Sequence, residues 1–187
     1  MSYDNIIKQY VKVIKGLKIE HCKAEEFISQ LDGAEIEIGE MKECEKPMIQ
    51  VIANGRRYFS YLGIPTMNEL WPFLNALVRI STNKVQLDQQ ELEMANSVKG
   101  NVKLFVTPDC TKCPIAAELL YQIALVNKNV NLEIIDSEAY EELAKKYHVM
   151  SVPKIVLNEK TDIPGGFPPN IVLKMLAKSS ANPEQQP

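Results

Sequence analysis

The chain has 187 residues, of which 45% are hydrophobic and 24% are charged, and its formal net charge is −3. This composition is typical of a globular protein with one large core or two smaller ones. No apolar run approaches the roughly 18 residues that span a bilayer, and no dense lysine or arginine block favours nucleic acid or an anionic membrane as a partner. The N-terminus lacks the apolar stretch and cleavage site of a signal peptide, so we expect a cytoplasmic protein.

The first half predicts a small α/β unit. A leading helix over about 2–15 precedes the run GLKIEHC, a short helix AEEFISQL and the alternating strand AEIEIGEM. Two further strands follow Pro47, and a Gly-x-Pro turn then leads into a helix with an apolar face. That face contains Leu70, Phe73, Leu74 and Leu77. A polar helix over 87–98 connects this unit to the rest of the chain.

The second half predicts the order β-α-β-α-β-β-α. Its strands are expected at 102–106, at 131–135, at 152–158 and after the segment NEKTD. Its helices begin near Pro114, Ser137 and Pro169; proline suits a first helical turn, and Ser137 is expected to cap the middle helix. The segment 179–187 has no apolar content to bury, so we expect it to be disordered.

The end of each half repeats one pattern. A proline opens a strand, a second strand follows, and a glycine-proline turn leads into a closing helix. The matching pairs are Pro47 with Pro153, Gly63 with Gly166 and Pro65 with Pro168. This similarity favours a duplication. We therefore divide the chain into units over 1–83 and 84–178, the second including the connecting helix, with a tail over 179–187.

Two cysteines, Cys110 and Cys113, lie three residues apart between the strand VKLFV and the helix that begins near Pro114. At this spacing their Cα atoms lie roughly 5 to 6 Å apart, which permits a disulfide. The positive end of a helix dipole favours a thiolate at Cys110, and Lys112 adds a further cation. Cys113, one turn deeper, is expected to be more buried. The arrangement predicts attack by Cys110 on a disulfide and resolution of the mixed disulfide by Cys113.

A second element of this predicted site is the Val152–Pro153 step, which opens a strand after HVMS. A proline at such a position, with apolar strands around it, is where a cis X–Pro bond can be held. We expect it to lie beside the thiols, with Val152 free to pair with an extended substrate segment. Thr111 and Lys112 are expected to complete this substrate edge and to tune the potential of the thiols.

These residues, with Gly165 and Gly166 before the last helix, resemble the glutaredoxin branch of the thioredoxin superfamily. The order of the whole chain resembles the two-unit protein disulfide oxidoreductases of archaea and thermophilic bacteria, and the N-terminal domain of the alkyl hydroperoxide reductase flavoprotein subunit. The resemblance implies an α/β fold of two tandem thioredoxin-like units, each with a mixed central sheet flanked by helices. It also implies that the first unit is reduced, because that unit has no CxxC.

The chain departs from these families at several positions. Where the first unit would carry a CxxC, it has Cys22 alone, with Glu25 in place of a second thiol, so we expect this unit to be redox-inert or monothiol. Thr107 stands where glutaredoxins tend to have a lysine for the glutathione carboxylate. The strand VKLFV carries no buried acid of the thioredoxin kind, which leaves the proton acceptor for Cys113 unassigned.

Other residues are given structural interpretations. We expect Cys22 and Cys44 to be small buried hydrophobic residues and not a disulfide, and His148 to lie at the surface. Trp71, Tyr61 and Phe59 are expected to pack in the core or between the units. Glu69 aligns with an acid of the two-unit relatives but also suits the start of a helix, so its role stays open. A zinc site at the CxxC would need two more ligands, and none lies at a compatible spacing.

The sequence therefore predicts a thiol-disulfide oxidoreductase that acts on protein disulfides and dithiols. No bound cofactor is required, because the Cys110–Cys113 disulfide itself carries the two electrons. The resemblance implies a flavin-dependent thioredoxin-type reductase as the upstream partner. Two alternatives remain open: an electron relay to a peroxidase, and a non-catalytic thioredoxin-like module that binds proteins.

Overall fold

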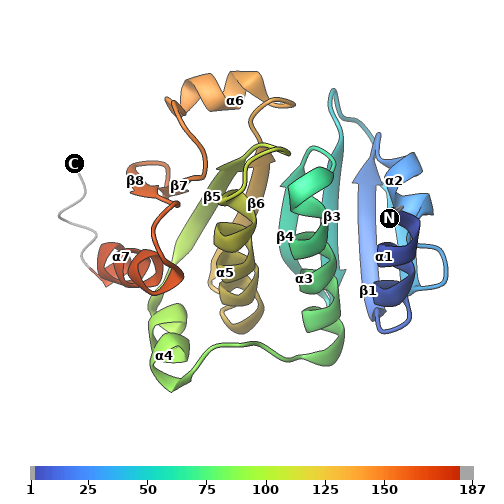
Figure 1. Ribbon diagram of the computed structural model, residues 1–187, viewed down its shortest axis with the longest axis horizontal. Coiled ribbons are helices and arrows are strands. Elements are labelled where there is room, and N and C mark those ends of the chain that lie inside the picture. The colour runs from blue at the N-terminus through green and yellow to red at the C-terminus, as the bar shows by residue number, and fades with distance from the viewer. Residues whose placement is uncertain (1–2, 182–187) are drawn as a thin grey trace.

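The computed structural model describes residues 3–181, in which eight strands form one sheet (Figure 1). The first unit contains α1 (Tyr3–Val11), β1 (Lys15–Cys22), α2 (Glu25–Ser29), β2 (Glu35–Glu40), β3 (Met48–Ala53), β4 (Arg56–Leu62), the 3-10 helix η1 (Met67–Glu69) and α3 (Leu70–Thr82). The second contains α4 (Gln89–Ser97), β5 (Gly100–Val106), α5 (Cys113–Val126), β6 (Val130–Asp136), α6 (Glu141–Lys146), β7 (Lys154–Leu157), β8 (Thr161–Pro164) and α7 (Pro169–Ala181). Helix α7 thus extends into the segment expected to be disordered, while residues 182–187 lie outside the described part.

The strand order shows the duplication directly. The sheet runs β2-β1-β3-β4-β6-β5-β7-β8, so each half places its second strand first and then its first, third and fourth strands. In each half the first two strands are parallel and the remaining pairs are antiparallel. A parallel pairing of β4 with β6 joins the halves. Both units therefore have the mixed sheet that the sequence predicts, and together they form a single continuous sheet.

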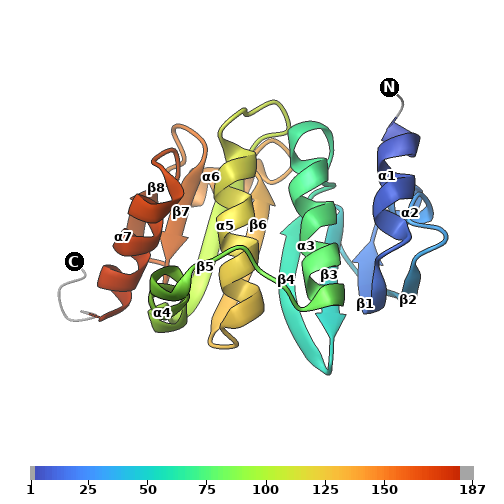
Figure 2. The same ribbon diagram turned by 60° about the horizontal axis from the view of Figure 1, so that its bottom comes forward.

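Helices cover the two faces of the sheet unequally. Figure 2 shows α1, α3, α5 and α7 in front of the sheet and α6 behind it. Tyr140, Leu143 and Tyr147 of the α6 region pack on the far face against a small core. That core contains Leu62, Phe105, Ile135 and Val156. In the first unit, residues 41–47 between β2 and β3 form no helix, so this unit is reduced as the sequence predicts.

The two units share a core between α3 and α5. Phe59 of β4 lies 4.6 Å from Tyr121 of α5 and 5.8 Å from Phe73 of α3, measured between ring centroids. Arg79 of α3 pairs with Glu118 of α5 at 2.6 Å, and both side chains are largely buried. Phe59 and Tyr61 are buried as predicted, whereas Trp71 is 40% exposed, so its predicted burial is wrong.

The start of α6 also differs from the prediction. Ser137 does not cap this helix: its hydroxyl is buried without a hydrogen-bond partner among the described residues, and α6 begins at Glu141. The carboxylate of Asp136 instead accepts hydrogen bonds from the main-chain N–H groups of Glu138 and Ala139. An Asx-type turn therefore occupies the residues that would have been the first helical turn.

Candidate active site

The CxxC lies where β5 ends and α5 begins. Cys110 and Cys113 form a disulfide with their Cα atoms 5.5 Å apart. Cys110 is partly exposed, whereas Cys113 is fully buried at the first turn of the 14-residue helix α5. The main-chain N–H of Cys113 donates to the Cys110 sulfur at 3.1 Å. This hydrogen bond, together with the helix dipole, favours a thiolate at Cys110 when the disulfide is reduced.

The loop before Cys113 is held from both units. Within the loop, the N–H of Cys110 donates to the Thr107 carbonyl at 3.2 Å. From the first unit, the side-chain amide of Asn68 donates to the Cys110 carbonyl at 3.3 Å, and the N–H of Asn68 donates to the Pro108 carbonyl at 3.0 Å. The first unit, which has no CxxC, therefore positions the CxxC of the second.

We expect Asn68→Ala to lower the rate of disulfide reduction by about 2- to 10-fold, since one hydrogen bond contributes about 0.5 to 1.5 kcal/mol to loop geometry. The measurement is the rate of insulin reduction, with Asn96→Ala on the exposed face of α4 as the matched control. Equal rates for the two variants would mean that Asn68 does not hold the loop in a productive geometry.

Val152 faces the CxxC across a shallow hollow. The hollow has a volume of about 370 Å³. It is lined by Thr107, Asp109, Cys110, Thr111, Lys112 and Val152. The Val152–Pro153 peptide bond is cis, and Pro153 itself is buried. The structure therefore brings the residues that the sequence names for the substrate edge to one place.

Gly165 allows the turn before α7 to approach this edge closely. A Cβ atom at Gly165 would lie 3.0 Å from the Pro153 Cβ and 3.1 Å from its carbonyl oxygen. The N–H of Gly165 donates to that same carbonyl at 3.1 Å. A larger residue would push the Pro153 loop away from the disulfide.

The chain matches two thioredoxin families. The Thioredoxin-like domain family matches residues 3–83, and the Thioredoxin domain family matches residues 100–177. The chain belongs to the thioredoxin superfamily. Its fold is similar to that of Sso1120 from Sulfolobus solfataricus, with 50% identity and a TM-score of 0.82 over 87% of this chain and 99% of that one.

More distant structures share the two-unit fold. The NTD_N/C domain of alkylhydroperoxide reductase AhpF from Enterococcus faecalis has 20% identity and a TM-score of 0.82, over 95% of this chain and 100% of that one. A protein disulfide oxidoreductase from Aeropyrum pernix has 18% identity and a TM-score of 0.73, over 96% and 93%. This thioredoxin-like chain spans about a fifth of the length of the curated relatives it matches, such as the alkyl hydroperoxide reductase AhpF of Pseudomonas aeruginosa, 26% identical over 52% of this chain and 19% of that one.

A buried acid of the first unit lies next to the thioredoxin-type disulfide. Glu69 ends η1, directly after Asn68, and η1 contacts α5. Its side chain is 1% exposed, and neither carboxylate oxygen has a hydrogen-bond partner among the described residues. Burial, and next the nearby Asp136, raise the pKa of Glu69 to about 8. Burial also raises the pKa of Asp136. The sequence shows the acid at a helix start but not its burial, so reasoning from sequence left its role open.

Exposed apolar side chains flank the disulfide. Met67 is 52% exposed and precedes Asn68, Ile115 is 52% exposed in the first turn of α5, and Met150 is 92% exposed before Val152. Phe167 is 48% exposed and follows Gly166, whose added Cβ would lie 3.7 Å from the Lys112 side chain. Exposed apolar groups gathered around a concave site are typical of a surface that binds another molecule.

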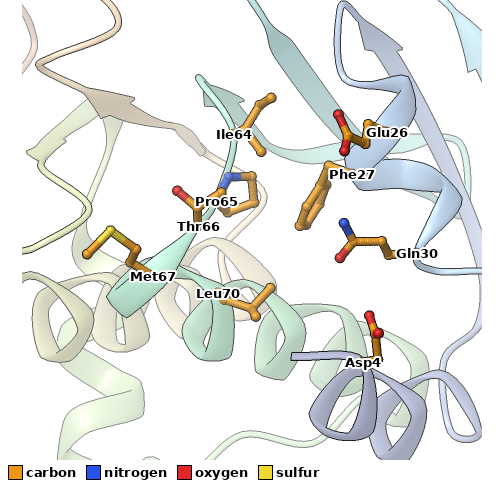
Figure 3. A pocket seen from close by; sticks show the side chains of 9 residues that line it. All are labelled: Asp4, Glu26, Phe27, Gln30, Ile64, Pro65, Thr66, Met67 and Leu70. Carbon is orange, nitrogen blue, oxygen red and sulfur yellow. The ribbon is translucent and has the colours of Figure 1, made fainter. Parts of the chain in front are cut away.

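Met67 also borders a larger hollow in the first unit (Figure 3). This hollow has a volume of about 570 Å³ and lies between α1, α2 and the segment 64–67. Phe27, Leu70, Ile64 and Pro65 supply its apolar lining, while Asp4 and Glu26 supply carboxylates. Its lining within the described chain includes no cysteine, so the hollow adjoins the redox site without being part of it.

The interpretation of Cys22 and Cys44 as unpaired hydrophobic residues is wrong. They form a disulfide with their Cα atoms 6.2 Å apart, and both residues are only partly buried. Cys22 ends β1 opposite Met48 of the antiparallel strand β3, and Cys44 precedes Met48 by four residues. The pairing of β1 with β3, which the sequence pattern does not show, brings the two cysteines together. The first unit lacks a CxxC, as predicted, but it does contain a disulfide.

Two further features of the described chain bear on function. Within residues 3–181, no group of three histidine, cysteine or acidic side chains could hold a metal ion. None of the helices in that range is long and apolar enough to cross a membrane. His148 is exposed just after α6, where it has a left-handed φ of 54°.

Proposed function

We propose that this chain is a thiol-disulfide oxidoreductase that exchanges electrons with protein disulfides through Cys110 and Cys113. The observation that carries the proposal is the asymmetry of the disulfide: Cys110 is accessible and hydrogen-bonded at the start of α5, and Cys113 is buried behind it. That arrangement provides one thiol for attack from outside and one for resolution from inside.

In the reduced state, the Cys110 thiolate attacks one sulfur of a substrate disulfide. The other substrate sulfur leaves as a thiolate, and a mixed disulfide links Cys110 to the substrate. Cys113 then gives up its proton and attacks the Cys110 sulfur, which releases the second substrate sulfur as a thiolate. The substrate has gained two electrons, and the Cys110–Cys113 disulfide has formed.

Glu69 is the group we propose as the proton acceptor for Cys113. Its carboxylate is free of hydrogen bonds within the described residues, and it lies beside the helix that begins at Cys113. With a pKa of about 8, Glu69 changes its protonation state in the same range as an ordinary thiol, for which about 8.5 is typical. Asp136 contributes by keeping that pKa high.

The substrate edge consists of Val152, Pro153, Thr111 and Lys112, with Met67, Ile115, Met150 and Phe167 around it. These apolar side chains favour an extended polypeptide over a small polar thiol as substrate. We propose that a flavin-dependent thioredoxin-type reductase returns electrons to the disulfide, and that the protein acts in the cytoplasm. No bound cofactor is needed, because the disulfide carries the electrons.

Iodoacetamide should distinguish the two thiols of the reduced protein. We expect Cys110 to be alkylated at least tenfold faster than Cys113 near pH 7, because only Cys110 is accessible and its thiolate is stabilised. Peptide mapping after timed quenching measures both rates. Equal rates from pH 6 to 9 would contradict the assignment of roles.

The proposed function itself is tested by reduction of insulin disulfides with dithiothreitol. The wild-type protein should accelerate the reaction, and the Cys22→Ser/Cys44→Ser variant should do so equally well. Absence of acceleration by a folded protein would favour a non-catalytic module that binds other proteins.

A second candidate function is electron relay to a peroxidase. The similarity to the alkyl hydroperoxide reductase AhpF over half of this chain favours it. The two functions share the chemistry at Cys110 and differ in the acceptor. If the reduced protein transfers electrons to a dithiol peroxidase much faster than to insulin, relay is the better description.

A further inference from the structure

We propose that Cys22–Cys44 is a second exchangeable disulfide, which opens and closes the substrate-type edge of the first unit. The internal repeat places it there. In the strand order, β1 occupies in the first half the position that β5 occupies in the second. Cys22 is the last residue of β1, and Cys110 lies just beyond the end of β5. The first unit therefore has a sulfur near the position of the attacking thiol.

Cys44 completes the correspondence. It lies in the segment 41–47, which leads through Pro47 into β3, just as the segment before Pro153 leads into β7. In the second unit these two segments face each other across the hollow shared by Cys110 and Val152. In the first unit the disulfide joins the equivalent segments covalently. The oxidised bond therefore holds closed the position at which the second unit receives its substrate.

The bond is open to attack. Cys22 and Cys44 are both partly buried, while their neighbours Lys23, Glu43 and Glu45 are exposed. The ammonium of Lys23 donates to the Glu45 carbonyl at 2.8 Å, which places a cation in the chain next to both cysteines. A cation at this position favours a thiolate once the bond is reduced.

The segment that carries Cys44 has few other restraints. Its main-chain hydrogen bonds lie at its two ends: Met41 N–H donates to His21 at 2.9 Å, and the Pro47 carbonyl accepts from Gly63 at 2.9 Å. In the described chain, residues 42–45 have no main-chain hydrogen bond to another main-chain group. The middle of the segment is thus held by the disulfide and Lys23, and reduction should release it.

The core of the first unit does not depend on this bond. Along β1, Leu17, Ile19 and His21 point toward the helix-covered face and are buried, so Cys22 points to the opposite face. The main apolar contacts, such as those of Phe73 with Phe27 and Phe59, lie on the helix-covered face. Reduction is therefore expected to open the segment 41–47 without unfolding the unit.

The two disulfides lie at the same edge of the sheet but cannot exchange directly. Strands β1 and β5 both end at the upper edge in Figure 1. Strand pairing sets Cys22 level with Phe105 through Met48, Leu62 and Ile135. Four strand spacings of about 4.8 Å separate β1 from β5, or about 19 Å. Each disulfide therefore needs its own contact with a partner.

The electron donor for Cys22–Cys44 is a dithiol protein. One donor thiolate attacks a sulfur of the Cys22–Cys44 bond and forms a mixed disulfide, and the other cysteine of the pair leaves as a thiolate. The second donor thiol then displaces the first donor sulfur. The donor becomes a disulfide, and Cys22 and Cys44 gain two electrons and two protons.

The test uses the full chain with Cys110→Ser and Cys113→Ser, so that only Cys22 and Cys44 remain. Reduced thioredoxin is the donor, and a maleimide polymer measures free thiols by gel shift. Reduction should proceed at least tenfold faster than global unfolding, which pulse proteolysis measures. Hydrogen exchange of residues 41–47 should then rise at least tenfold, while β1 and β3 keep their protection.

Reduction only at the rate of global unfolding would overturn the proposal and leave the bond as a structural cross-link. Reduction without faster exchange in 41–47 would overturn the opening of the edge. Since this variant lacks Cys110 and Cys113, its result does not depend on the function proposed for those residues. The insulin assay on Cys22→Ser/Cys44→Ser tests that function separately.

Discussion

Cys110→Ser is expected to abolish the acceleration of insulin reduction, a loss of at least 100-fold relative to the wild-type protein. Cys110 is the accessible sulfur of the pair, and serine at this position cannot form a mixed disulfide. The rate of precipitation of reduced insulin in dithiothreitol measures the loss. The fold should be unchanged, because Cys110 is partly exposed and its main-chain hydrogen bonds to Thr107 and Asn68 remain.

Cys113→Ser is the matched variant that separates the two roles. Cys110 can still attack, but no internal thiol can resolve the product, so turnover should fall by a similar factor. The variant should also accumulate a covalent complex with the substrate, visible on a non-reducing gel. If Cys113→Ser lost turnover without any trapped complex while Cys110→Ser formed one, the assignment of the two cysteines would be reversed.

Glu69→Gln is expected to slow resolution by Cys113 by about 100-fold at pH 7, the lower range for loss of general acid–base catalysis. The effect should shrink above pH 9, where a thiol loses its proton without help. Decay of a preformed mixed disulfide, followed from pH 6 to 10, measures this step. The exposed carboxylate of Glu141 in α6 provides the control variant, Glu141→Gln.

The same carboxyl group makes stability depend on pH. In the folded protein the pKa of Glu69 is raised from 4.5 to about 8, so the folded state keeps a proton that the unfolded state has already lost. The stabilisation is complete below about pH 4.5 and is lost as pH rises through about 8. The free energy of unfolding should fall by on the order of 4 kcal/mol across that range. Glu69→Gln should remove this slope, and a flat wild-type profile would mean that Glu69 is not buried as the structure shows.

Local sequence signals predicted much of the second unit. The strand before the CxxC, the helix that begins beside Pro114 and the strand opened by Pro153 each have a local signature. The structure brings Cys110 and Val152 together because these elements occupy their usual positions in a thioredoxin-like sheet. Where two local signals competed, the prediction failed: the Asp136 carboxylate, not the Ser137 hydroxyl, binds the main-chain N–H groups after β6.

Contacts between distant parts of the chain were not predictable. The Cys22–Cys44 bond depends on the antiparallel pairing of β1 with β3, which brings together residues 22 positions apart. The placement of Asn68 and Glu69 beside the CxxC depends on η1 contacting α5 of the other unit. Neither contact leaves a periodic pattern, because each joins single residues of different elements.

The parallel pairing of β4 with β6 makes the two repeats mechanically inseparable. Phe59 to Leu62 of β4 align with Leu132 to Ile135 of β6, so cutting the chain near residue 84 would leave each half with a bare, apolar strand at its edge. Such edges promote aggregation. Only β2 and β8, at the outer ends of the sheet, are edge strands in the described protein. The repeats should therefore melt in one cooperative transition, and hinge motion between them would have to break a strand pairing.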